Sequence, residues 1–386
     1  MTKYNTPALR FDGFDGEWGD TTLEQLFEYG GSGGTPSKSR PEFYGGDIPF
    51  LGIADIRDRV ITHTNKTITE LGLKNSAAWK IPAGAISLAM YASVGRVGIA
   101  GMELTTSQAF YNMVFSNDAT RSFVYAHLAK MELMSEWDVH ISTGTQRNLN
   151  AFKVRTLPIK IPSSFEEQRA IGVLFAVLDA LIEQHRAKLA NLQQTKTALM
   201  QRMFPRDGAD EPELRLGVFS GVWESRTLSE LTAINNGLDY KHLNEGDIPV
   251  YGTGGYMLSV DRALSYKTDA IGIGRKGTID KPYMLRAPFW TVDTLFYITA
   301  REGANLQFLL AQFQRIDWKS KNTATGVPSL TSVTIGQTSV SIPPTLEEQR
   351  AIGEVFSNLD ALITAEHRYI TQLTQAKTAL LQRMFV

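Results

Sequence analysis

The most constraining feature of the chain is a long segment that occurs twice. Residues 161–204 recur at 342–385 with a constant offset of 181 residues and no gap. Both copies keep the motifs EEQRAIG and LDALI and end in QRMF. A gapless match of this length indicates one structural unit used twice. The chain is therefore a tandem duplication.

The segments that precede the two copies repeat more loosely. LRFDGFDGEWGDTTLEQL at 9–26 matches LRLGVFSGVWESRTLSEL at 214–231, and GGDIPFLG at 45–52 matches EGDIPVYG at 245–252. Short β-branched and aromatic runs separated by Gly and Pro predict strands, with helical patches near 21–28 and 119–134. We therefore expect an α/β (α+β) fold with two globular domains.

The repeated segments carry apolar residues at spacings of three and four, the pattern of a coiled-coil seam. At 1.5 Å per residue each helix would be about 58 Å long and too one-sided to be stable alone. Antiparallel pairing of the two copies gives an internal pseudo-two-fold repeat. The alternatives are parallel pairing and two separate core helices, each packed on its own domain. The seam residues are Phe175, Leu178, Ile182, His185, Leu189, Leu192 and Leu199, and then Phe356, Leu359, Ile363, Glu366, Ile370, Leu373 and Leu380.

Full antiparallel overlap of 166–204 with 347–385 places the centre of the seam at His185 and Glu366. Their opposite chemistry predicts one polar cross-pair that fixes the register. The alternative is that both side chains lie at the solvent-exposed edge of the seam and never meet. Lys196 and Lys377, away from the centre, would face apolar residues and extend their charged ends outward.

These patterns divide the chain into five parts. The 386 residues suit two domains, each with its own core,. The predicted parts are a first domain at 1–163, a helix at 164–204, a linker at 205–213, a second domain at 214–343 and a second helix at 344–386.

Composition and the N-terminal sequence predict a cytoplasmic protein. The chain has no cysteine, which argues against a disulfide framework and is compatible with a reducing compartment,. The start MTKYNTPALRFDG lacks the apolar core of a signal peptide,. No apolar run approaches the roughly 20 residues of a membrane span.

Motifs for catalysis, cofactors and metals are missing from the sequence. GIGRKG at 272–277 satisfies G-x-G-x-x-G, but TIDKPYMLRAPFW follows it where a dinucleotide site needs a helix,. There is no phosphate-binding G-x-x-x-x-G-K-[ST] loop, and no NPPY or DPPY string of amino-methyltransferases,. The six histidines show no metal-ligand spacing,. We expect no catalytic residue, metal or bound cofactor on this chain.

Candidate contacts to nucleic acid lie in loops that contain Gly, Arg, Lys, Thr and Asn. Arg and Lys read guanine edges, Asn and Gln read adenine, and Gly lets the backbone approach phosphate. The formal net charge of −1 requires acidic residues to collect elsewhere, in the helices and the linker,. The alternative is that these loops are solvated turns. The candidates are Ser37, Lys38, Arg40, Tyr91, Ser93, Arg96, Thr145, Gln146, Arg147 and Asn148, and then Tyr251, Thr253, Tyr256, Arg275, Lys276, Thr278, Lys319, Lys321 and Asn322.

Further motifs recur in a fixed order along the chain: IPSSFEEQ and IPPTLEEQ, GGTPS followed by PEFYGGDIPFLG, IGIGRKGTIDKPY, VDTLFYI, and the stretches GTQRNLN and GVPSLT before the helices. Together they resemble the DNA-specificity subunit of a Type I restriction-modification system. The resemblance implies two target-recognition domains, each reading one half of a split, asymmetric double-stranded DNA site. The helices would set the length of the unread spacer.

The resemblance also implies partners and their cofactors. Two methyltransferase subunits would dock on this chain and use S-adenosylmethionine, and restriction subunits would use ATP and Mg to translocate and cut DNA. The chain itself would be a non-catalytic subunit. The alternative function is a protein scaffold whose domains bind other proteins and whose helices act as a spacer. Glycine-flanked basic loops favour nucleic acid, because a protein-binding surface would expose an apolar, aromatic hot spot.

Overall fold

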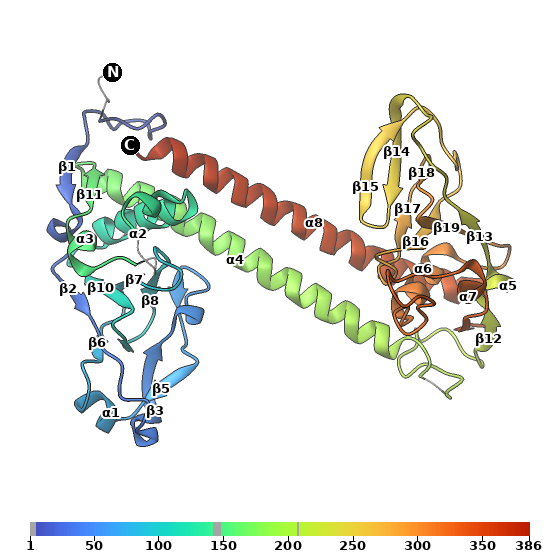
Figure 1. Ribbon diagram of the computed structural model, residues 1–386, viewed down its shortest axis with the longest axis horizontal. Helices are drawn as coiled ribbons and strands as arrows, with labels where there is room; N and C mark the ends of the chain where they lie inside the picture. The colour runs from blue at the N-terminus through green and yellow to red at the C-terminus, as the bar shows by residue number, and fades with distance from the viewer. Residues whose placement is uncertain (1–4, 142–147, 207) are drawn as a thin grey trace. The chain divides into compact units, whose positions relative to one another are not determined.

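The structure is a computed structural model that describes residues 5–141, 148–206 and 208–386. The chain forms two compact units, which are Met1–Ala187 with Arg368–Val386, and Lys188–His367. Each unit holds one mixed α/β domain and part of both long helices (Figure 1). These helices are α4 (Phe165–Arg202) and α8 (Leu346–Met384). The predicted fold class, two mixed domains with two long helices, is confirmed.

The first domain, which precedes α4, contains two β-sheets and a strand pair formed by β1 (Gly19–Thr22) and β11 (Pro158–Ile161). The five-stranded sheet has the order β2 (Tyr29–Ser32), β10 (Phe110–Val114), β7 (Ile86–Ala89), β8 (Val97–Ala100), β4 (Val60–Ile61). The four-stranded sheet has the order β5 (Lys66–Ile68), β3 (Tyr44–Leu51), β9 (Leu104–Thr106), β6 (Trp79–Ile81). The α-helices are α1 (Glu70–Lys74), α2 (Asp118–Leu133) and α3 (Ala151–Arg155), and the 3-10 helices are η1 (Leu23–Gln25), η2 (Pro41–Phe43), η3 (Ile53–Asp55) and η4 (Glu136–Val139).

The second domain, between α4 and α8, repeats this plan with fewer strands. β12 (Glu224–Thr227) pairs with β20 (Ser339–Ile342). One sheet has the order β13 (Thr232–Asn236), β19 (Leu295–Ala300), β16 (Ala270–Gly274), β17 (Tyr283–Leu285). The other has the order β15 (Gly255–Val260), β14 (Glu245–Gly252), β18 (Trp290–Thr291). Its helices are α5 (Leu228–Leu231), α6 (Leu306–Arg315) and α7 (Ser332–Gly336).

Asparagine side chains start the principal helix of each domain. Asn117 accepts hydrogen bonds from the backbone N–H groups of Ala119 and Thr120 at the start of α2. Asn305 accepts one from the N–H of Phe308 at the start of α6. Short side-chain oxygens at this position satisfy helix donors that have no partner within the helix. The sequence therefore fixes the same helix start in both domains.

An aromatic cluster joins both long helices to the domain in each unit. In the first unit the ring of Phe385, just after α8, lies 5.9 Å from that of Phe175 in α4 and 6.2 Å from that of Trp18. In the second unit Phe204, just after α4, lies 5.6 Å from Phe356 in α8 and 6.0 Å from Trp223. The end of one helix therefore packs beside the start of the other in both units, which is antiparallel pairing.

The glutamate that precedes Gln in EEQRAIG anchors the N-terminal segment of each domain to its helix. Arg10 donates two hydrogen bonds of 2.7 Å to the buried Glu167. Arg215 makes the same two contacts, at 2.8 Å, to Glu348. These hydrogen bonds raise the pKa of both arginines. A bidentate pair of this kind fixes orientation as well as charge.

The glutamine and glycine of EEQRAIG bring α4 against α2. Gln168 accepts a hydrogen bond from the Thr120 hydroxyl and donates one to the Pro162 carbonyl. A Cβ on Gly172 would lie 2.5 Å from the Cβ of Ser122. The repeated motif therefore forms the part of the long helix against which the domain packs.

The fourteen predicted seam residues are all at least partly buried in the structure. Of these, Phe175, Ile182, Phe356 and Glu366 are buried. In the first unit the His185 ring lies 4.4 Å from the Tyr369 ring. In the second, Lys188 Nζ lies 2.5 Å from Glu366 Oε1. A direct contact between His185 and Glu366 would join the two units and stays a prediction.

The predicted role of the seam lysines is wrong. Lys377 Nζ lies 2.5 Å from Asp179 Oδ1, and Lys196 Nζ lies 2.5 Å from Asp360 Oδ1. These contacts are copies of one another across the 181-residue repeat. The lysines pair across the seam because a partly buried ammonium group is more stable beside a carboxylate than over apolar side chains.

We predict that Gly172→Ala destabilises the protein by about 1 to 3 kcal/mol, because the added methyl group overpacks the contact with Ser122,. Gly217→Ala is the matched control, since a Cβ there meets nothing within 4 Å. Its effect should stay within about 0.5 kcal/mol. Chemical denaturation of both variants gives the comparison, and equal stabilities would contradict close packing at Gly172.

A second prediction concerns His127 in α2, whose ring lies 5.6 Å from that of Phe385. Burial lowers the pKa of His127 to about 3, with Lys130 adding to the effect. The unfolded chain binds this proton near pH 6.5, so stability present above pH 6.5 is lost as the pH falls toward 3,. The wild type should lose about 1 kcal/mol more than His127→Leu between pH 7 and 5.5. Parallel curves for the two proteins in pH-dependent unfolding would refute this.

Candidate nucleic-acid interface

The loop between β16 and β17 in the second domain has a fixed backbone and exposed basic side chains. The backbone N–H of Arg275 donates to the Thr294 carbonyl at 2.7 Å, and that of Gly277 donates to the Pro328 carbonyl at 2.9 Å. Gly277 has a φ of +91°, which glycine adopts without strain,. The side chains of Arg275 and Lys276 are exposed. The loop therefore presents two cations at defined positions.

Three further loops meet this one, and we call the set 251–256, 275–282, 319–323 and 326–329 the second-domain loop cluster. Thr253 Oγ1 lies 3.7 Å from the place a Cβ would take on Gly277. Lys319 Nζ lies 2.7 Å from Asp280 Oδ2. The backbone N–H of Ser329 donates to Asn322 Oδ1 at 2.9 Å. The cluster brings together the predicted residues Tyr251, Thr253, Tyr256, Arg275, Lys276, Thr278, Lys319, Lys321 and Asn322.

The first domain has a matching arrangement around loop 90–96, between β7 and β8. The backbone N–H of Leu149 donates to the Met90 carbonyl at 2.9 Å, and that of Leu330 donates to the Arg275 carbonyl at 3.0 Å. Leu330 is the copy of Leu149 at the 181-residue offset. One backbone contact thus holds equivalent loops in both domains.

The tip of loop 90–96 has a strained backbone and two exposed candidate side chains. Ala92 and Ser93 have positive φ angles of 34° and 65°. Such conformations cost of order 1 kcal/mol or more each and gather at functional sites. Tyr91 and Ser93 are exposed. Asn148, which is half-buried, lies next to Leu149, whereas the predicted residues Thr145, Gln146 and Arg147 lie outside the described residues.

Arg96 is only partly available for contact with nucleic acid. Its Nε lies 3.6 Å from Glu132 Oε1 in α2. Burial raises the pKa of Glu132, and Arg96 opposes that shift. A contact between Arg96 and a phosphate would therefore compete with this ion pair.

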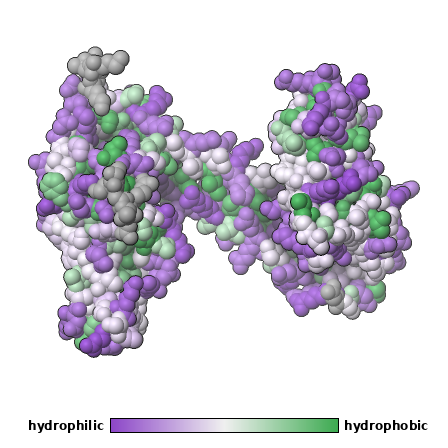
Figure 2. Space-filling model, viewed as in Figure 1, coloured by the Kyte–Doolittle hydropathy of each residue, from purple (hydrophilic) through white to green (hydrophobic). Residues whose placement is uncertain are grey.

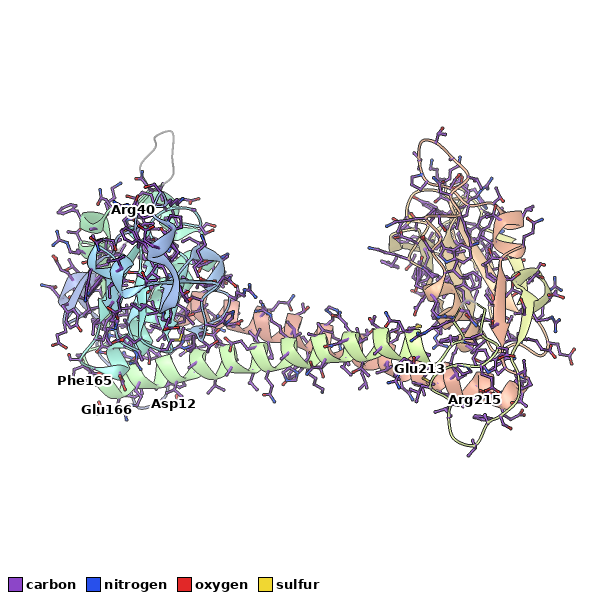
Figure 3. All side chains as sticks on the ribbon, turned by 90° about the horizontal axis from the view of Figure 1, so that it is seen from below. Asp12, Arg40, Phe165, Glu166, Glu213 and Arg215 are labelled. Atoms are coloured by element: carbon purple, nitrogen blue, oxygen red, sulfur yellow. The ribbon has the colours of Figure 1, made fainter. Side chains whose placement is uncertain are left out.

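Ser37, Lys38 and Arg40 form a separate exposed segment, before η2. A Cβ on Gly33 would lie 1.8 Å from the Thr106 carbonyl oxygen, so only glycine fits where GGTPS crosses β9. Gly237 makes the same approach to Val292 in the second domain, at 2.0 Å. Figure 3 shows Arg40 at the end of the first domain away from Phe165 and the start of α4.

The structure adds Gln108 and Ser329 to the candidates. Gln108 Oε1 accepts a hydrogen bond from Thr35 Oγ1 at 2.8 Å. It therefore links GGTPS to the chain beside loop 90–96, where the Met90 N–H donates to the Ala109 carbonyl. Ser329 belongs to GVPSLT, which already stood out in the sequence. Gln108 carried no sequence signal, because only the tertiary fold brings it to Thr35.

Other kinds of site are missing from the described part of the chain. No group of three or more His, Cys, Asp or Glu side chains there could hold a metal ion. Within the same residues, no helix is long and apolar enough to cross a membrane. On the face in Figure 2, hydrophobic residues are scattered among hydrophilic ones over both domains.

Comparison with protein families matches the chain to the Type I restriction modification DNA specificity domain at residues 15–194 and 221–375. The chain belongs to this family. The two matched ranges cover both domains and most of both long helices.

Curated relatives carry the same description. The specificity subunit of the Type I restriction enzyme MjaIX from Methanocaldococcus jannaschii is 31% identical over 192 residues, which are 49% of this chain and 44% of that protein. The HindI specificity subunit from Haemophilus influenzae is 29% identical over 160 residues, 40% of this chain and 35% of that protein. The matches thus span less than half the length of these relatives.

A solved structure shares the fold over the full chain. The S subunit of a Type I restriction-modification system from M. genitalium has a TM-score of 0.79 and 18% identity, with 99% of both chains covered. At this identity the likeness concerns the fold.

Proposed function

We propose that this chain is a sequence-specific DNA-binding specificity subunit of a Type I restriction-modification complex. Each domain reads one half of a bipartite double-stranded DNA site, and the chain itself carries no catalytic residue. The observation that carries this proposal is the backbone contact shared by the two domains, Leu149 to Met90 and Leu330 to Arg275. It presents equivalent loops whose tips carry different side chains.

The chemistry of these tips favours nucleic acid. Arg275 and Lys276 in the second domain supply cations for guanine edges or phosphate, and Tyr91 and Ser93 in the first supply a ring and a hydroxyl,. Exposed acidic side chains such as Glu166 and Glu347 lie at the starts of the long helices, outside these loops. A net charge of −1 is therefore compatible with a basic contact surface,.

The partners follow from residues that are exposed yet identical in both helix copies. Packing explains why buried positions carry the same residue in both copies. Exposed positions do not need the same residue for the helices to pair. The positions share one helix face by their spacing. We propose that two methyltransferase subunits, one for each copy, bind this face. These positions are Glu166 and Glu347, Arg169 and Arg350, Ala180 and Ala361, Gln194 and Gln375, Ala198 and Ala379, Gln201 and Gln382, and Arg202 and Arg383.

The remaining partners and cofactors complete the proposal. The methyltransferase subunits would bind S-adenosylmethionine, and restriction subunits would bind ATP and Mg. The assembly would act in the cytoplasm, where the DNA of the cell lies. A complex of this chain with the methyltransferase subunits alone would suffice to test sequence recognition.

We predict that the methylated DNA site is asymmetric and split. Because the loop tips of the two domains differ, the half-sites should differ, with a spacer of fixed length between them. Sequencing of methylated adenines in cells that express this chain with its methyltransferase partner measures the motif. A palindromic or uninterrupted motif would contradict the proposal.

A further prediction concerns the second half-site. Arg275→Ala or Lys276→Ala should weaken binding by about 1 to 3 kcal/mol if the side chain makes a bidentate base contact, and should leave recognition of the first half-site intact. Arg286→Ala is the matched control. Arg286 is exposed at the other end of β17, paired with Asp269 at 2.6 Å.

Binding of duplexes with changes in either half-site, measured at several salt concentrations, distinguishes the outcomes. Unchanged affinity of both variants at every salt concentration would mean that the loop does not face DNA.

A further inference from the structure

The first unit contains a cavity of about 570 Å³ between the first domain and the two long helices. Residues after η3, from α2, from α4 and from α8 line it. Its walls carry both acidic and basic side chains. The charged residues that the argument uses are Arg59, Glu132, Asp179, Glu183 and Lys377.

Arg59 contacts two helices directly at this cavity, α2 and α4, and a third, α8, through Asp179. Its Nη1 lies 3.5 Å from Asp179 Oδ2 in α4, and only about a tenth of either side chain is exposed. The guanidinium carbon lies 4.2 Å from the centre of the Tyr125 ring in α2. The backbone N–H of Arg59 donates to Glu183 Oε1 at 3.1 Å. Through Asp179, Arg59 also meets Lys377 of α8.

The charges at this point depend on one another. Asp179 accepts Lys377 on Oδ1 and faces Arg59 with Oδ2. Arg59 Nη1 and Asp179 Oδ2 have no hydrogen-bond partner among the described residues, so the pair is held by charge. A buried carboxylate that loses one of its cations is costly. The position of the loop that carries Arg59 therefore depends on the ion pair between the two long helices.

In the second unit the copy of this ion pair has a different third partner. This copy, Lys196 with Asp360, is completed by Gln314 of α6, which lies 2.8 Å from Lys196 Nζ. The side chain of Asp360 is 35% exposed, against 11% for Asp179. After β14 the second domain turns directly into β15, where the first domain has η3 and the Arg59 loop. The duplication thus supplies the Asp–Lys pair, and the first domain adds the arginine.

We propose that Arg59 is a positioning residue for DNA recognition. It ties the first domain to the Asp179–Lys377 ion pair, and the tie fixes where the loops of this domain stand relative to the helix pair. The first domain then binds its half-site at a fixed position relative to the helix pair, so the complex selects one spacer length. This inference rests on the proposed function and adds a residue that touches neither DNA nor a partner.

The test compares Arg59→Met with Arg57→Met in the complex with the methyltransferase subunits. Arg57 lies in the same loop and lines the same cavity, but its hydrogen bond goes to the Ala54 carbonyl. Methylation is measured on duplexes with the native spacer and with spacers one base pair longer or shorter. Arg59→Met should reduce the preference for the native spacer about tenfold, while changes within either half-site stay as harmful as before. Arg57→Met should keep the wild-type preference.

Arg59→Lys should restore part of the spacer preference, because it keeps the charge but not the planar fork. An unchanged preference in Arg59→Met, whatever its thermal stability, overturns the proposal. Should Arg59→Met not fold, Arg59→Lys decides, and a wild-type preference there overturns it.

A wild-type complex without sequence-specific methylation would instead refute the proposed function. The link between Arg59 and the helix pair is then measured by backbone hydrogen exchange in residues 53–61. This exchange should be faster in Arg59→Met than in Arg57→Met. Equal exchange in the two variants would remove the tie as well.

Discussion

Neither long helix can bury its apolar stripe by itself, and the rest of the fold depends on how the two stripes are paired. The pairing is antiparallel, so each compact unit takes the start of one helix and the end of the other. Asp179 with Lys377 and Lys196 with Asp360 give both units the same register. Apolar burial supplies the attraction, and these ion pairs select one alignment among those that would bury a similar area.

Repetition in the sequence was enough to predict the helices, their seam and two mixed α/β domains, because packing periodicity and internal identity are local signals. The ion pairs of Lys196 and Lys377 were not predicted, because they depend on which carboxylates the partner helix brings across the seam. Arg96 was expected at a contact surface, but α2 brings Glu132 to it. The loop cluster could not be assembled from composition alone, since tertiary hydrogen bonds such as Leu330 to Arg275 create it.

The two domains show how a duplicated scaffold diverges internally. In the first domain Asn112 donates to Thr106 and accepts from Ser87, its partner across the strand pair. In the second domain the corresponding pair is Tyr297 opposite Gly272. Thr291, in the place of Thr106, is then buried without a hydrogen-bond partner among the described residues. The larger ring replaced a polar network while the strand order around it was kept, so the framework tolerates changes near the loops it presents.

The division of the units across the helices also sets an order of assembly. The second unit is one continuous stretch, Lys188–His367, whereas the first needs Arg368–Val386 to complete it. Phe385, which packs between Phe123 and Phe175, belongs to this later segment. A ribosome therefore delivers every residue of the second unit before the first can close its core. The first domain is made first, but its core is completed only by residues that follow the whole second unit.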